Sequence, residues 1–285
     1  MSTLTQQDTF LPPAAPAAGP RSFARAHALP LFFGLAYIFS WLIWVPLALN
    51  QLGWVRLGLD EGLIQIVRLF GTLGPALAAT VVAMWMGGAR GVGALWGQLG
   101  RWRVRWVWYA AAMLVLPALL LAAAGLYRLL PGVEPLPPAD TSVGNLALIM
   151  VIMAISVTGE EVGWRGMALP LMLGRWPALR AGLLMGVLWT AWHLPFWIVL
   201  DQLARFGWGY WLINLVFISS ISVYLTWVMV NTGNNVLLAV LAHWTFNVVS
   251  AALLVTSVVP AYVIFAGLAA AAAVVVGARL QAKPK

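Results

Sequence analysis

Eight long apolar stretches run along this sequence, and short loops rich in Pro, Gly and Arg separate them. Most are close to the ~20 residues that a helix needs to cross ~30 Å of hydrocarbon, and none alternates like a strand. The pattern therefore predicts an all-α, polytopic transmembrane helical bundle of about eight spans. The stretches cover residues 29–49, 64–86, 106–126, 143–173, 181–200, 208–230, 236–254 and 258–280.

Composition supports a membrane protein. Of the 285 residues, 62% are hydrophobic and only 8% are charged, whereas soluble domains carry about 25% charged residues. A soluble enzyme, a nucleic-acid-binding domain and a disordered chain are therefore excluded as main interpretations. With no cysteine, disulfides, thiolate metal sites and a cysteine nucleophile are excluded too. Residues 1–26 have no apolar core before Arg21 and are expected to form a flexible cytoplasmic tail, followed by one transmembrane domain at 27–285.

Basic residues predict the orientation in the membrane. Eleven fall in the tails and in the loops after even-numbered spans, against three in the opposite loops. Because loops rich in Arg and Lys stay in the cytoplasm, we expect cytoplasmic N- and C-termini, in a bacterial inner membrane. The eleven are Arg21, Arg25, Arg90, Arg101, Arg103, Arg105, Arg175, Arg180, Arg279, Lys283 and Lys285; the three are Arg56, Arg128 and Arg205.

Ionisable residues inside spans cost at least ~2.5–3.5 kcal/mol at mid-depth, so each is a candidate for function. Arg68 lies about one turn into the second span, near its outer end, where its side chain is expected to reach the interface. The other five fall within 84 residues, on three helices that also carry Asn247. They are Glu160, Glu161, Arg165, His193 and His243.

The two glutamates face different directions on a helix. Glu161 and Arg165 are four residues apart and can pair, whereas Glu160 is rotated by about 100° and has no partner in its own helix. An unpaired carboxylate in an apolar site suits a general base. The alternative is that Glu160 only pairs with a distant arginine, Arg175 or Arg180.

The two histidines have different surroundings. Pro195 follows His193 and should kink the fifth span there, loosening the backbone beside the imidazole. His243 and Asn247 share a helix face, and together they could hold a developing oxyanion. The alternatives are a hydrogen-bonded core histidine at 193 and an interhelical pair that serves packing at 243 and 247.

These motifs, in this order and in membrane helices, resemble the CPBP family of intramembrane proteases. That family comprises the CAAX proteases and bacteriocin-processing enzymes, also called the Abi family, and it includes the endopeptidase that removes three residues after a prenylated cysteine. The segment at 71–79 resembles the family's early Gly/Pro element. Trp189 stands where the family usually has Phe, a change expected to leave the chemistry intact.

The resemblance implies roles for individual residues. Glu160 and His193 would activate water, His243 and Asn247 would form the oxyanion hole, and Glu161 with Arg165 would shape the site. The expected partners are the lipid bilayer and a peptide or protein substrate that is prenylated or hydrophobic at its C-terminus, and no nucleic acid.

Zinc is the open question of the chemistry. The family has been described as metalloproteases, and Glu160, His193 and His243 could make a three-ligand catalytic zinc set. The sequence has no His-Glu-x-x-His motif, however, and if His243 serves the oxyanion, only Glu160 and His193 remain, which is too few for a catalytic zinc. A metal-free hydrolase is therefore favoured.

Two other functions compete with a protease. They are a non-catalytic immunity or scaffold factor and a proton-coupled transporter. Counting about 1.5 Å per residue along each span predicts a site in the cytoplasmic half, open to peptides from that side.

Overall fold

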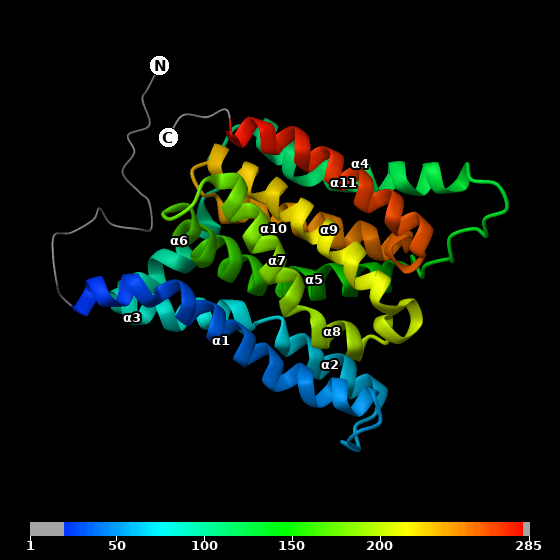
Figure 1. Ribbon diagram of the computed structural model, residues 1–285, viewed down its shortest axis with the longest axis horizontal. Helices are drawn as coiled ribbons and strands as arrows, with labels where there is room; N and C mark the ends of the chain where they lie inside the picture. Colours follow the sequence, from blue (N-terminus) through cyan, green and yellow to red (C-terminus); the bar gives the residue numbers. More distant parts are fainter. Residues whose placement is uncertain (1–19, 282–285) are drawn as a thin grey trace.

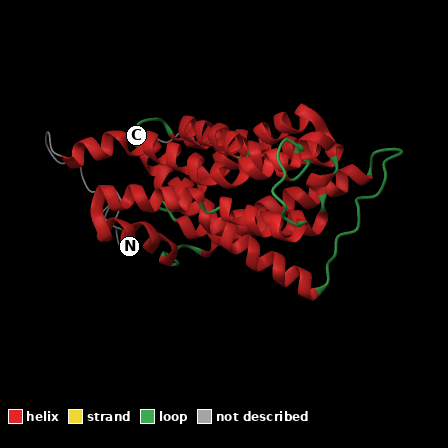
Figure 2. Ribbon diagram, turned by 90° about the horizontal axis from the view of Figure 1, so that it is seen from below, coloured by secondary structure: helices red, strands yellow, loops and turns green. Residues whose placement is uncertain are grey.

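The computed structural model describes residues 20–281, and within them the chain forms helices and no strand (Figures 1 and 2). The predicted all-α class is confirmed. The α-helices are α1 (Pro20–Gln51), α2 (Glu61–Gly71), α3 (Gly74–Gly97), α4 (Trp106–Arg128), α5 (Val143–Gly163), α6 (Leu169–Leu173), α7 (Ala178–Trp192), α8 (Leu194–Val199), α9 (Gln202–Asn231), α10 (Val236–Leu253) and α11 (Val259–Gln281). Three short elements join them: the 3₁₀ turns η1 (Gln98–Gly100) and η3 (Val255–Ser257), and the π-helical η2 (Trp164–Ala168).

Seven helical segments of the described chain are long and apolar enough to cross a membrane. The remaining apolar stretch forms the shorter helix α7 and its continuation α8. Together they match the eight predicted stretches. Helix α1 begins and α11 ends at the same end of the bundle, as an even number of crossings requires (Figure 1). Helix α1 begins at Pro20, inside the segment assigned to the tail, and residues 1–19 lie outside the described part.

Small residues bring the central helices close together. A Cβ added at Gly163, near the end of α5, would overlap Pro75 of α3, and one added at Gly74 of α3 would overlap Ser40 of α1. The Gly/Pro segment seen in the sequence therefore lets α1, α3 and α5 approach at backbone distance. Helix α5 also packs on α10, and α7 packs on α9. This packing places α5, α7 and α10 around one interior region.

Two helical irregularities flank that region. Directly after α5 the chain forms the π-helical η2, a form that is rare and often found at functional sites. Helix α7 ends at Trp192 and α8 begins at Leu194, with Pro195 in its first turn. The predicted kink beside His193 is confirmed, because proline cannot continue the hydrogen-bond pattern of the preceding helix.

Candidate active site

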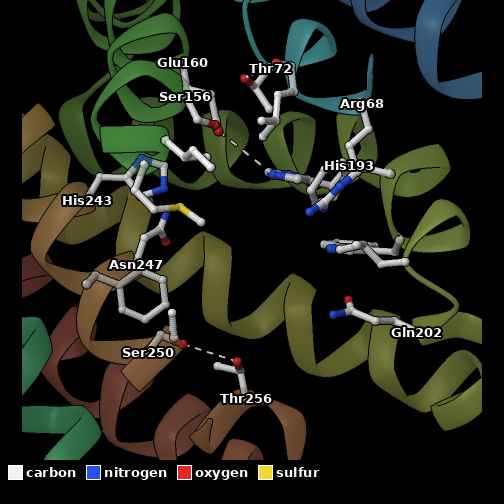
Figure 3. Close-up of a pocket in the computed structure, with 18 of the residues that line it drawn as sticks. Arg68, Thr72, Ser156, Glu160, His193, Gln202, His243, Asn247, Ser250 and Thr256 are labelled. Atoms are coloured by element: carbon white, nitrogen blue, oxygen red, sulfur yellow. Dashed lines mark hydrogen bonds and ion pairs between the residues drawn. The ribbon is translucent and has the colours of Figure 1, made fainter. Parts of the chain in front are cut away.

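The predicted site residues line one cavity. Glu160 comes from α5, His193 from the break between α7 and α8, and His243 with Asn247 from α10 (Figure 3). The cavity has a volume of about 600 Å³, within the range of ligand-binding clefts. Three helices that are distant in sequence thus bring all four groups together.

Glu160 is held beside His193. The Glu160 side chain is nearly buried, with 5% of the residue exposed. Its Oε2 accepts a hydrogen bond from Trp189 Nε1 at 2.9 Å and lies 4.0 Å from His193 Nε2. His193 Nδ1 lies 2.9 Å from the Trp189 carbonyl; because a carbonyl only accepts, Nδ1 carries the hydrogen, and Nε2 of the neutral ring is an acceptor.

The space between these two acceptors suits one water molecule. A gap of 4.0 Å is too long for a direct hydrogen bond. A water lying about 2.8 Å from each atom could donate one hydrogen to Glu160 and the other to His193. The arrangement thus orients a water with its oxygen lone pairs free to face the cavity.

Glu161 joins Arg165 and His243, which lie on different helical elements. Its Oε1 accepts hydrogen bonds from Arg165 Nη1 at 2.9 Å and from His243 Nδ1 at 2.8 Å. Both Glu161 and Arg165 are fully buried. The predicted pair of Glu161 with Arg165 is confirmed, and it persists although Arg165 lies in the π-helical segment.

The contact between Glu161 and His243 was missed from sequence. It joins residues 82 positions apart on different helices, and no spacing rule reaches that far. Its consequence is chemical, because a carboxylate at Nδ1 fixes the hydrogen on that nitrogen. His243 then has Nε2 as its second polar atom, and that atom donates only when both ring nitrogens carry hydrogen.

Trp189 connects the two halves of the site. Its indole donates to Glu160, lies 4.3 Å from the guanidinium carbon of Arg165, and meets the His243 ring edge-on at 5.2 Å. From the sequence, Trp189 was expected to be equivalent to the Phe that the family usually has at this position. A phenyl ring has no donor, however, so the hydrogen bond to Glu160 depends on tryptophan.

The cavity extends away from the chain termini. Besides the four site residues, the cavity is lined by residues at the helix ends that lie farthest from the chain termini. Among them are Gln65, Asn145 and Gln202. Its lining reaches Ile66 and Leu148, each 57% exposed. Toward the termini the buried η2 and α6 fill the space, and Figure 1 shows α6 at that end. The expectation that the site opens at the end carrying the termini is therefore wrong: packing of η2 closes that side.

The three candidate zinc ligands are spread around the cavity. Among residues 20–281, no group of three His, Asp or Glu side chains gathers closely enough to hold a metal ion. His243 directs Nδ1 at Glu161, which leaves Nε2 as its other ring nitrogen, and a carboxylate on one nitrogen is compatible with a metal on the other. The alternative zinc set of Glu160, His193 and His243 does not form a compact group among residues 20–281.

Comparison with known proteins agrees with the site. Residues 142–249 match the family model described as type II CAAX prenyl endopeptidase Rce1-like. Both comparisons support similarity to CAAX prenyl proteases. The second match is "CAAX prenyl protease 2" of Methanococcus maripaludis, which is 27% identical over 103 residues, or 35% of this chain.

The match to that relative is local. The aligned segment spans 38% of the relative's own length. The family match at 142–249 nevertheless includes every residue of the candidate site, from Glu160 to Asn247. The similarity is therefore concentrated where the cavity is built.

Proposed function

We propose that this protein is an intramembrane endopeptidase of the CAAX-prenyl-protease type, which hydrolyses a peptide bond close to the C-terminus of its substrate. The observation that carries the proposal is the pair of acceptors, Glu160 Oε2 and His193 Nε2, at 4.0 Å beside a cavity of about 600 Å³. Such a pair, inside an apolar bundle, is suited to holding and deprotonating one water. The match to CAAX proteases supports the same reaction.

The chemical step follows from these positions. The water oxygen attacks the peptide carbonyl carbon while Glu160 takes a water proton, and the carbonyl π electrons move onto oxygen. The tetrahedral intermediate then collapses, the C–N bond breaks, and Glu160 returns the proton to the leaving amine. Water is consumed, two peptides are formed, and the step as written uses only groups of this chain.

Asn247 and His243 donate hydrogen bonds to the developing oxyanion. The carboxamide of Asn247 always carries hydrogens, so its donor role is independent of protonation. His243 donates through Nε2 only with both nitrogens protonated, a form whose Nδ1 hydrogen bond Glu161 accepts. Glu161 and Arg165 therefore act through His243, by fixing where the ring lies and how it is oriented.

The cavity walls define the substrate class. Most lining side chains are apolar or aromatic, among them Ile152, Phe217 and Phe246. They suit a substrate with a prenyl chain or apolar residues next to the cleaved bond. Such a segment would enter from the end opposite the termini, or from the bilayer near Ile66 and Leu148, which are exposed at the cavity edge.

A comparison of membrane peptidomes tests this function. Cells that produce the wild-type protein should show at least one shortened C-terminus that is missing with Glu160→Gln. Glu134→Gln changes an exposed loop acid by the same chemistry and serves as the matched control. Identical peptidomes for wild type and Glu160→Gln would count against proteolysis and favour a non-catalytic role or transport.

A further inference from the structure

One cation of the cavity has no place in this mechanism. Arg68 of α2 was expected to extend toward the interface, but its side chain lies in the cavity wall, on the same side as His193 (Figure 3). It is half-buried, and its Nε is buried without a hydrogen-bond partner among residues 20–281. The guanidinium carbon lies 5.4 Å from the Phe196 ring.

No acid among residues 20–281 forms an ion pair with this guanidinium, and Glu61 acts on it only from a longer distance. The acid closest in sequence, Glu61, is exposed, and its Oε1 accepts a hydrogen bond from Gln65 at 2.5 Å. Ion pairs among the described residues join other groups, at Arg165, His193, Arg205 and His243. An arginine inside an apolar cavity is costly unless an anion pairs with it. The cavity therefore has a place for one anionic group.

Resting on the proposed function, we propose that Arg68 binds the free C-terminal carboxylate of the substrate and so sets how far from that end the chain is cut. Arginine presents parallel N–H donors that match a carboxylate in bidentate fashion. A peptide bound in this cavity brings one such group, its own terminus. Arg68 is thus a specificity-determining residue, separate from the groups that activate water.

Distances set an upper limit on the length of the released segment. The Arg68 guanidinium carbon lies 5.4 Å from the Phe196 ring, which lies 6.0 Å from the His193 ring. The guanidinium carbon therefore lies no farther than the sum of these two distances from the centre of the imidazole ring. About three extended residues would cover that upper limit. A terminal carboxylate at Arg68 would therefore place the cleaved bond no more than about three residues upstream, beside Glu160.

The test compares one peptide in two forms. The probe is a fluorogenic peptide whose fourth residue from the C-terminus is an S-farnesyl cysteine. It is made with a free C-terminal carboxylate and, separately, with a C-terminal carboxamide. The wild-type protein should cleave the acid with a kcat/KM roughly 10- to 100-fold above that of the amide, the range for one charge-assisted pair. Arg68→Gln should lower the acid to the level of the amide and leave the amide unchanged. Arg68→Lys should retain part of the preference.

Matched measurements separate this assignment from folding and from proteolysis itself. Arg205→Gln removes an exposed arginine that pairs with Asp201 at 3.1 Å, near the same end of the bundle. This variant should leave kcat/KM unchanged for both the acid and the amide. Binding of both peptides to the inactive Glu160→Gln protein, with and without Arg68→Gln, should show the same acid preference without any cleavage.

Several results would overturn the assignment. They are equal cleavage and equal binding of acid and amide by the wild-type protein, or an Arg68→Gln effect that is the same for both peptides. An effect that follows the content of anionic lipid, and not the peptide terminus, would make Arg68 a headgroup site. If no protein cleaves either peptide but acid-selective binding through Arg68 persists, the proposed proteolysis fails and the carboxylate site stands.

Discussion

Replacing each of the two adjacent glutamates by glutamine should separate stability from catalysis. Glu161 is fully buried and is the carboxylate that both Arg165 and His243 contact. Glu161→Gln leaves the Arg165 charge without its ion pair, while Nε and Nη2 of that arginine already lack partners among the described residues. Breaking a buried pair costs about 3–5 kcal/mol. A domain of this size loses roughly 2–4 °C in Tm per kcal/mol, so Tm should fall by on the order of 10 °C.

Glu160→Gln should behave in the opposite way. In the wild type, Trp189 Nε1 donates to the Glu160 carboxylate at 2.9 Å. The amide oxygen of glutamine can still accept this hydrogen bond, so Tm should stay close to that of the wild type. Activity should disappear, because an amide cannot take the proton of the attacking water. Thermal unfolding in detergent and peptide cleavage, measured on the same preparations, give both readings.

A double variant removes the remaining ambiguity. Glu161→Gln with Arg165→Met removes both charges, and it should recover most of the lost Tm, since no unpaired buried charge remains. Cleavage should stay low, because His243 has lost the carboxylate that orients it. A Glu161→Gln protein with the wild-type Tm, or a strongly destabilised Glu160→Gln protein, would refute this division of roles.

Three further predictions address the other parts of the site. Asn247→Ala should lower kcat by roughly 10²–10³ with little change in KM, as for an oxyanion donor; a normal kcat would remove Asn247 from the site. Trp189→Phe should lower kcat by roughly tenfold, the effect of one lost hydrogen bond to a charged group, and an unchanged kcat would make the indole a packing residue. A reporter that fluoresces only in the cytoplasm, fused after Lys285, should be bright, and a dark fusion with an active periplasmic reporter would contradict the orientation inferred from the arginines.

Local spacing predicted much of this structure. Long apolar stretches gave the helices, because only a helix satisfies its backbone within lipid. The four-residue spacing of Glu161 and Arg165 gave their ion pair, and Pro195 gave the break after α7. Each of these features depends on residues within one helix turn or on one stretch of chain.

Features that depend on packing between helices were missed. The contact of Glu161 with His243, and that of Trp189 with Glu160, join residues 82 and 29 positions apart. The direction of the cavity was predicted wrongly, because helix length gives depth but says nothing about which end side chains fill. Arg68 was predicted to lie at the interface for the same reason. The sequence gives its distance from the end of the helix, but it does not show that a cavity lies beside it.

The direct test of the central claim is where the oxygen of the attacking water ends up. Purified protein should cleave the farnesylated peptide in ¹⁸O-labelled water, with a strong chelator present. In a single turnover, one ¹⁸O should appear in the new carboxylate of the product and none in the carboxylate of Glu160, and Glu160→Gln should give no product. Label in Glu160, activity lost to the chelator, or cleavage by Glu160→Gln would contradict a water activated by Glu160 and His193.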